Sequence, residues 1–256
     1  MISDFEPIVH RMDGRTIKVW AVADVHIGAR NADLDGFKAF LKRVQADEDS
    51  YIVIVGDLLE NNTRDSVSDY GYLPPSSQVD LAVELLQPVA DRILGVVGGN
   101  HEFRTTRATD LDPLYAVCLM LLANGESLAH LYRQNFAFLR IVLERGNIRD
   151  RYALMLVHGK TANKKRHFAY AVEGVDAIVS GHTPDGLVEK PAKLVFTPSN
   201  NVRIQPLVSI TATSWLPFSD YAARSLCMPK ATSCPQYMEL EFTGSNSSEG
   251  AIKVVW

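Results

Sequence analysis

The chain has 256 residues and a mass of 28.4 kDa, with 46% hydrophobic residues, 22% charged residues and a formal net charge of −4. This length supports one substantial α/β domain, and the composition is that of an ordinary globular protein, which argues against a disordered chain or a coiled coil. A net charge of −4 gives no general attraction to nucleic acid or to anionic lipid.

Apolar runs alternate with helical patterns along the first half of the chain, as in a sheet whose strands are joined by crossover helices. Apolar and β-branched runs predict buried strands over residues 17–23, 51–55 and 93–97. Apolar residues at helical spacing predict helices over residues 33–45, 77–90 and 111–123. We expect Pro88 to end the second helix early.

The second half of the chain predicts more strands than helices. Strands are expected over residues 136–143, 152–157 and 175–179, with a short helix over residues 165–172. From residue 187 onward, alternating segments such as 202–211 and 236–242 predict antiparallel strands. The polar stretch 61–78 is the longest expected loop, and loops of this length are usually functional or mobile. With no internal repeat, the sequence predicts a single domain over residues 1–256.

Cysteine usage and the first residues indicate a reducing compartment. None of Cys118, Cys227 and Cys234 lies in a CxxC motif, so a disulfide framework is not expected, although a pair between the last two stays open. The N-terminal residues are acidic and include a proline where a signal peptide has a basic start and an apolar run. Apolar runs are strand-sized, too short to cross a bilayer. We expect a cytoplasmic protein without a membrane partner.

Polar side chains with metal-binding chemistry follow five of the predicted strands. The segments are Asp24-Val25-His26, Gly56-Asp57, Gly99-Asn100-His101-Glu102, His158-Gly159 and Gly181-His182-Thr183. Because ligands of open α/β sheets bind at the carboxyl ends of strands, we expect these segments to meet at one rim. They supply carboxylate, imidazole and amide groups without a thiolate, a set that suits Mn, Fe, Ni or Zn rather than a structural cysteine–zinc site.

Each segment alone also has an ordinary structural interpretation. Asn100 can be a turn residue or a helix N-cap, and Glu60 can be a solvated acid after a strand. His158 and His182 can each be a hydrogen-bonded histidine at a strand end. The metal site is favoured by the joint pattern, because unrelated polar residues would have to fall in this order at five strand ends.

The order DxH, GDxxE, GNHE, H and GH resembles the calcineurin-like metallophosphoesterase superfamily over about residues 16–184. The resemblance implies a four-layer α/β/β/α sandwich of two mixed sheets, followed here by strands over residues 187–256. It implies a centre of two divalent ions, with Mn²⁺ as the best candidate and Fe, Zn or Ni as alternatives. It also implies hydrolysis of phosphate mono- or diesters, in which a hydroxide between the metals attacks phosphorus.

The resemblance further assigns the metal ligands. Asp24 and His26 would bind the first metal, and Asp57 would bridge both ions. The second metal would be completed by Asn100, His158 and His182. His101 would protonate the leaving alkoxide, and Glu60 would orient that histidine.

One position departs from the family pattern. Many members end the last motif as GHxH, whereas this chain has Pro184 in place of the second histidine. Proline cannot bind a metal, so water or another residue such as Asp185 would complete the first site. We expect the first metal to be the weaker and more exchangeable one.

Basic residues near the motifs are candidates for binding the substrate phosphate. Arg104 follows GNHE and suits a bidentate phosphate contact, with a surface salt bridge as an equal alternative. Lys160 and the basic run 164–166 follow His158, although a solvated helix face is the more ordinary interpretation. Trp215, Phe218 and Tyr221 are expected to pack in the C-terminal part rather than stack on bases.

Three functions stay open at this point. The first is a phosphomonoesterase or phosphodiesterase with a small or protein-borne phosphate ester as substrate. The second is a nuclease similar to the superfamily's DNA-repair exonucleases, with nucleic acid as substrate, supported only by the basic run and the loop 61–78. The third is a binding scaffold without metals, against which the intact motifs argue. The sequence identifies neither the substrate nor an oligomeric state.

Overall fold

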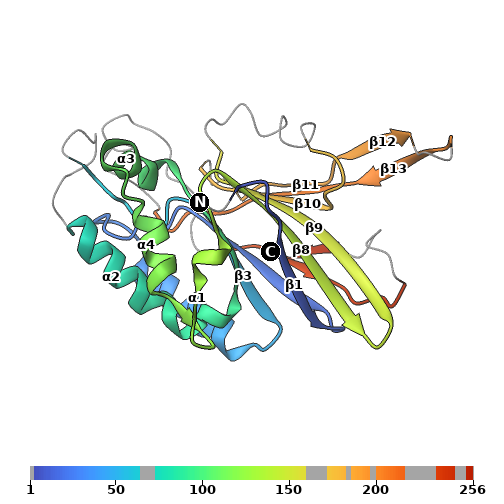
Figure 1. Cartoon of the computed structure of the whole chain (residues 1–256), viewed down its shortest axis with the longest axis horizontal. Helices are drawn as coiled ribbons and strands as arrows, with labels where there is room; N and C mark the ends of the chain where they lie inside the picture. Colours follow the sequence, from blue (N-terminus) through green and yellow to red (C-terminus); the bar gives the residue numbers. More distant parts are fainter. Residues whose placement is uncertain are drawn as a thin grey trace.

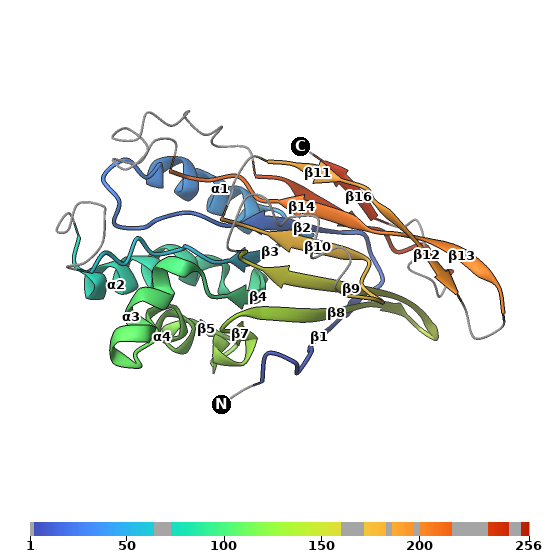
Figure 2. The ribbon, with the colours of Figure 1, turned by 90° about the horizontal axis from the view of Figure 1, so that it is seen from above.

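A computed structural model of the chain describes residues 3–63, 73–159, 172–182, 186–196, 200–216, 235–245 and 252–255. Their strands form two six-stranded mixed sheets, with helices gathered beside one of them (Figures 1 and 2). The predicted α/β class with two mixed sheets is therefore confirmed. None of the described helices is long and apolar enough to cross a membrane.

The first sheet contains the three strands predicted in the first half of the chain. Its order is β16 (Ile252–Val255), β15 (Tyr237–Leu240), β2 (Ile17–Val22), β3 (Ser50–Val55), β4 (Ile93–Val97) and β7 (Tyr132–Arg133). The strands β2, β3 and β4 are parallel neighbours, as their crossover helices require, whereas β15 pairs antiparallel with β2. Their carboxyl ends consequently lie at the same edge of the sheet.

The second sheet is built around a long antiparallel hairpin. Its order is β1 (Ile8–Asp13), β8 (Phe136–Arg145), β9 (Ile148–Val157), β10 (Ala177–Ser180), β14 (Val208–Thr211) and β11 (Val188–Glu189). The strands β9, β10 and β14 run parallel to one another. Only Ile8 is buried in the edge strand β1, which explains why no apolar run predicts that strand.

Four α-helices are described. They are α1 (Leu34–Ala46), α2 (Pro75–Leu86), α3 (Asn100–Thr109) and α4 (Pro113–Met120), with the 3₁₀ helix η1 (Gln87–Arg92) directly after α2. α1 packs against β3, and α2 contacts both α1 and α4. The short helix predicted over residues 165–172 lies outside the described residues, except for Val172.

The boundaries of two helices, α2 and α4, differ clearly from the predicted ones. α2 begins at Pro75, two residues before the predicted start, because proline is compatible with the first helical position. The predicted helix 111–123 is shorter, since Asp112 caps α4 and the chain turns into β5 (Leu122–Ala123) after it. Leu111, Leu119 and Met120 are 69%, 47% and 48% exposed, so this apolar segment is not wholly buried.

The core lies between the two sheets, and Gly95 of β4 shows how closely they approach. A Cβ atom at Gly95 would lie 3.1 Å from Leu156 and 3.2 Å from Leu139, both in the second sheet. The expected segment 202–211 is divided into β13 (Val202–Pro206) and β14 by the buried Leu207. Among the described strands, β13 pairs with β12 (Ala192–Phe196) alone, and this hairpin projects beyond both sheets (Figure 2).

The remaining short elements connect α4 to β7 of the first sheet. β5 pairs with β6 (Glu126–Ser127), and the 3₁₀ helix η2 (Leu128–Leu131) then leads into β7.

Candidate metal centre

All five motif segments meet where the carboxyl ends of β2, β3 and β4 face those of β9 and β10. The backbone N–H of Asp24, after β2, donates to the carbonyl of Gly56, after β3, at 3.1 Å. The N–H of His182, after β10, donates to Asp24 Oδ2 at 2.9 Å and so joins the two sheets. The predicted rim is therefore present, with Asp24, Asp57 and His158 at most 3% exposed.

Asp24, His26 and Asp57 form a first group whose ligand atoms all lie within 4.8 Å of one another. The ring of His26 is held by Glu60, whose Oε2 lies 2.7 Å from His26 Nδ1. The other ring nitrogen, Nε2, faces the group at 3.8 Å from Asp24 Oδ1. A hydrogen bond at one imidazole nitrogen leaves the other as the ligand atom.

Asp57, His158 and His182 form a second group within the same limit, and Asp57 belongs to both. His158 Nδ1 donates to the carbonyl of Val55 at 2.8 Å, which leaves Nε2 at 3.1 Å from Asp57 Oδ2. The amide oxygen of Asn100 lies 3.0 Å from His158 Nε2 and 2.7 Å from His182 Nδ1. All six residues predicted as ligands are thus brought together.

The chemistry and backbone of these residues fit the binding of divalent metal. Carboxylate, amide and imidazole atoms gather in groups that share Asp57, which suits metals that prefer nitrogen and oxygen ligands. Asp24, His26, Asp57 and His182 have φ angles of 51°, 54°, 51° and 66°, in the left-handed region. Non-glycine residues in this region are strained, and such strain gathers at functional sites.

Neighbouring buried charges shift the pKa values of three of these residues. Burial opposes the charged form of His26, but Asp24, Glu60 and Asp57 together raise its pKa to about 10. Burial likewise opposes charge on His158, and the Asp57 carboxylate raises the pKa of that histidine to about 9. Burial also opposes ionisation of Asp57, yet the surrounding histidines hold its pKa well below the ordinary value.

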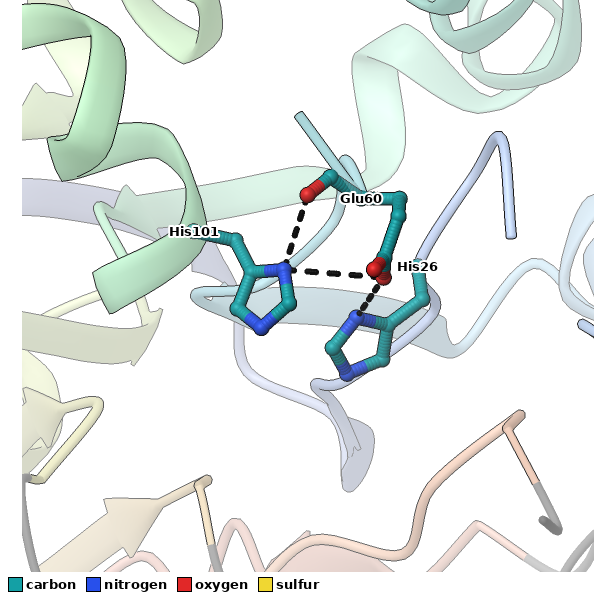
Figure 3. Close-up of side chains that lie close together, drawn as sticks. All are labelled: His26, Glu60 and His101. Carbon is teal, nitrogen blue, oxygen red and sulfur yellow. Dashed lines mark hydrogen bonds and ion pairs between the residues drawn. The ribbon is translucent and has the colours of Figure 1, made fainter. Parts of the chain in front are cut away.

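Glu60 lies between His26 and His101 (Figure 3). Its carboxylate is 2.7 Å from His26 Nδ1 and 3.5 Å from His101 Nδ1. His101 Nδ1 instead makes its shorter contact, 2.8 Å, with the backbone carbonyl of Glu60. The expected contact between Glu60 and His101 is present, but the carboxylate lies closer to the predicted ligand His26. The ligand atoms of these three residues also lie within 4.8 Å of one another.

Arg104 lies beside His101, and among the described residues it forms no salt bridge. Its Nη2 is 3.1 Å from His101 Nε2, and its Nη1 donates to Asn62 Oδ1 at 3.2 Å. Since His101 Nδ1 donates to Glu60, Nε2 is the nitrogen that accepts from Arg104. Burial is the main reason that the pKa of His101 falls to about 4, and the charges of His26 and Arg104 act in the same direction.

Two supporting residues were missed from the sequence. Glu102 is 1% exposed, and its carboxylate accepts the N–H groups of Gly99, Asp57 and Leu59 at 2.9, 3.1 and 2.9 Å. Burial raises its pKa to about 7. The amide of Asn61 donates to the carbonyl of His101 at 2.7 Å. Glu102 could have been found as the fourth residue of GNHE. Asn61 has a φ of 44°, which asparagine tolerates better than most residue types do.

Several predicted residues lie outside the described part of the chain. These are Lys160, the run 164–166, Pro184, Asp185, Phe218, Tyr221, Cys227 and Cys234. Trp215 is 2% exposed and its ring lies 5.1 Å from that of Phe37, which confirms its predicted packing role.

At Gly56, even the methyl group of alanine should disturb the ligand geometry of the centre. Its φ is 83°, and a Cβ atom there would lie 2.5 Å from His158 Nδ1 and 2.7 Å from Gly99 Cα. We expect Gly56→Ala to lower the free energy of unfolding by about 1–3 kcal/mol and to weaken metal binding, because His158 must shift. Denaturant unfolding and calorimetric metal titration measure the two effects.

Gly125→Ala is the matched control for this prediction. Gly125 has nearly the same φ, 82°, but its Cβ would meet nothing within 4 Å. It therefore carries the backbone strain without the crowding. Equal metal binding by the two variants would show that Gly56 does not position His158.

The chain is similar to a known family in sequence and to several solved structures in fold. The sequence profile described as calcineurin-like phosphoesterase matches residues 17–186. No curated protein sequence matches the chain. Among solved structures, the Escherichia coli phosphoesterase Yfce is 20% identical, with a TM-score of 0.41 and 88% of each chain covered.

Two further structures are similar at lower identity. The calcineurin-like phosphoesterase YfkN from Bacillus subtilis is 14% identical, with a TM-score of 0.44, and the alignment covers 94% of this chain and 90% of that one. GAP50, the anchor in the inner membrane complex of Plasmodium, is 9% identical, with a TM-score of 0.50 and coverage of 94% and 84%. At this identity the likeness to GAP50 concerns the fold alone.

Proposed function

The chain belongs to the calcineurin-like phosphoesterase family, and we propose that it hydrolyses phosphate mono- or diesters with two divalent cations. The observation that carries the proposal is the sharing of Asp57. This buried carboxylate belongs to both the group with Asp24 and His26 and the group with His158 and His182. When bound, two cations at such a site act as Lewis acids on the phosphate and lower the pKa of water.

The residues of this chain would hold the cations in a prearranged cage. His26 and His158 present Nε2, because Glu60 and the carbonyl of Val55 occupy their Nδ1 atoms. Glu102 would fix the backbone that carries Asp57 through its bonds to the N–H groups of Asp57 and Leu59. Such outer hydrogen bonds orient ligands and maintain their geometry.

In this proposal His101 donates a proton from Nε2 to the leaving alkoxide. In the substrate-free arrangement that nitrogen accepts from Arg104, and the low pKa of His101 makes the ring neutral at pH 7. A phosphate would attract the Arg104 guanidinium to its oxygens through bidentate hydrogen bonds. Its negative charge would also raise the pKa of His101, so that Nε2 gains the proton that it later transfers.

Mn²⁺ is the cation that we propose, because the ligand set combines carboxylates with imidazoles and has no thiolate. A cytoplasmic location is part of the proposal, since Cys118 is a buried free thiol, as expected in a reducing compartment. The nuclease alternative stays a prediction. The groove that would support it needs Lys160 and the run 164–166, which lie outside the described residues.

Removal of metal is the direct test of the proposed function. We expect chelator-treated protein to lose hydrolysis of aryl phosphate mono- and diesters, and added Mn²⁺ to restore it best. Metal content measured by mass spectrometry must accompany each assay. A panel of cyclic nucleotides and of single- and double-stranded DNA then identifies the substrate class. Full turnover after confirmed metal removal would contradict the proposal.

A further inference from the structure

The β12–β13 hairpin presents one face made entirely of apolar side chains. Residues directly opposite each other in the hairpin are Ala192 and Pro206, Leu194 and Ile204, and Phe196 and Val202. Because alternate residues of a strand point to the same side, these six side chains share a face, here called the ribbon face. Its four large members, Leu194, Phe196, Val202 and Ile204, are 77%, 68%, 61% and 68% exposed.

The opposite face of the hairpin is turned toward the body of the protein. Lys193 Nζ donates to the carbonyl of Val172 at 2.7 Å. Lys193 and Gln205 also line a small space together with Val175 and Leu207. These contacts fix which side of the hairpin faces outward. The ribbon face is therefore held away from the body, at the end of the molecule opposite α2 and α3 (Figures 1 and 2).

An uncovered ribbon of this kind is unfavourable in water. A two-stranded ribbon is at best marginally stable by itself, and its stability depends on burial of an apolar face. Contiguous exposed apolar side chains usually mark a binding surface. The high exposure of Leu194, Phe196, Val202 and Ile204 shows that nothing in the described part of this chain covers them.

We propose that the ribbon face binds the ribbon face of a second copy of the chain, in a two-fold symmetric dimer. The size of the side chains along the hairpin makes this face its own complement. The small pair Ala192 and Pro206 lies at the base, and the larger pair Phe196 and Val202 lies near the tip. When two ribbons pack face to face in opposite directions, each large tip pair lies on the small base pair of the partner.

Charge and symmetry favour the same arrangement. Lys193 and Arg203 alternate with the apolar residues along the two strands, so their side chains belong to the opposite face. No like charges would then meet inside the interface. A two-fold interface uses the same patch on both copies, and the central Leu194 and Ile204 would lie close to the axis.

The size of the ribbon face indicates a reversible association. Strands of five residues extend about 17 Å. This face is smaller than the roughly 800 Å² that each partner contributes to a standard interface. We therefore expect a dimer that dissociates in roughly the micromolar range.

Sedimentation equilibrium of the full chain tests the proposal, from about 1 to about 200 µM protein. We expect the mass to rise from 28.4 kDa toward twice that value as concentration increases. Leu194→Glu should keep the protein monomeric throughout, because it places a charge at the centre of the interface. Leu111→Glu is the matched control, since Leu111 is 69% exposed but lies between α3 and α4, and it should dimerise like the unaltered chain.

A cysteine at the axis provides a second readout that does not depend on a disruptive charge. Leu194→Cys should form a disulfide-linked dimer under mild oxidation, because the two copies of residue 194 lie near each other across the axis. Leu111→Cys should not. A monomer at every concentration, a dimer that persists in Leu194→Glu, or a monomer whose Leu194 instead governs binding to phosphatidylcholine vesicles would each overturn the proposal.

Discussion

Asp57→Asn is expected to abolish phosphoesterase activity and to reduce the metal bound per chain from two ions to at most one. Asp57 is the residue common to both ligand groups. It is 2% exposed, so water cannot take the place of its carboxylate as a ligand. The amide has nearly the same shape but cannot balance the charge of two cations. Asparagine also tolerates the φ of 51° at this position, so the substitution removes charge without adding backbone strain.

Calorimetric titration of the metal-free variant measures this loss, with metal content as an independent check. Asp110→Asn is the matched control, because Asp110 also has a left-handed φ, 59°, but lies exposed at the end of α3. It should bind two ions and retain activity. If Asp57→Asn bound two ions as tightly as the unaltered protein, the bridging role would be wrong.

His101→Gln should keep both metals and lower kcat by roughly 10²–10⁴-fold, the usual effect of losing a general acid. The defect should depend on the leaving group. An alkyl phosphate needs a proton on the departing oxygen, whereas a nitrophenolate leaves without one, so the loss should shrink for nitrophenyl esters. Steady-state kinetics over a series of leaving groups measures this dependence.

His130→Gln is the control for this series, because His130 is exposed and lies in η2, away from the ligand groups. It should behave like the unaltered protein on every ester. Equal losses on good and poor leaving groups would exclude His101 as the acid. Loss of one metal would instead identify His101 as a ligand, an arrangement that its proximity to His26 and Glu60 permits.

Local sequence patterns predicted the elements that carry the centre because those elements are buried. The runs that form β2, β3 and β4 are almost wholly apolar, and α1 buries Phe37, Phe40, Leu41 and Val44 on one face. Burial on this scale imposes a strand or helix period that a sequence displays directly. The helix α3 was missed because its only buried residue is Glu102, so its sequence shows no apolar period.

The order of ligand types at the strand ends was fixed by the sequence alone, since a parallel sheet brings successive carboxyl ends to one edge. Only the tertiary structure decided which groups touch across the two sheets. It placed the Glu60 carboxylate closer to His26 than to His101, and it set Arg104 against the imidazole of His101. It also left the large side chains of the ribbon face exposed. These relations depend on how separate sheets and loops pack together, and periodicity within one segment carries no information about its neighbours in space.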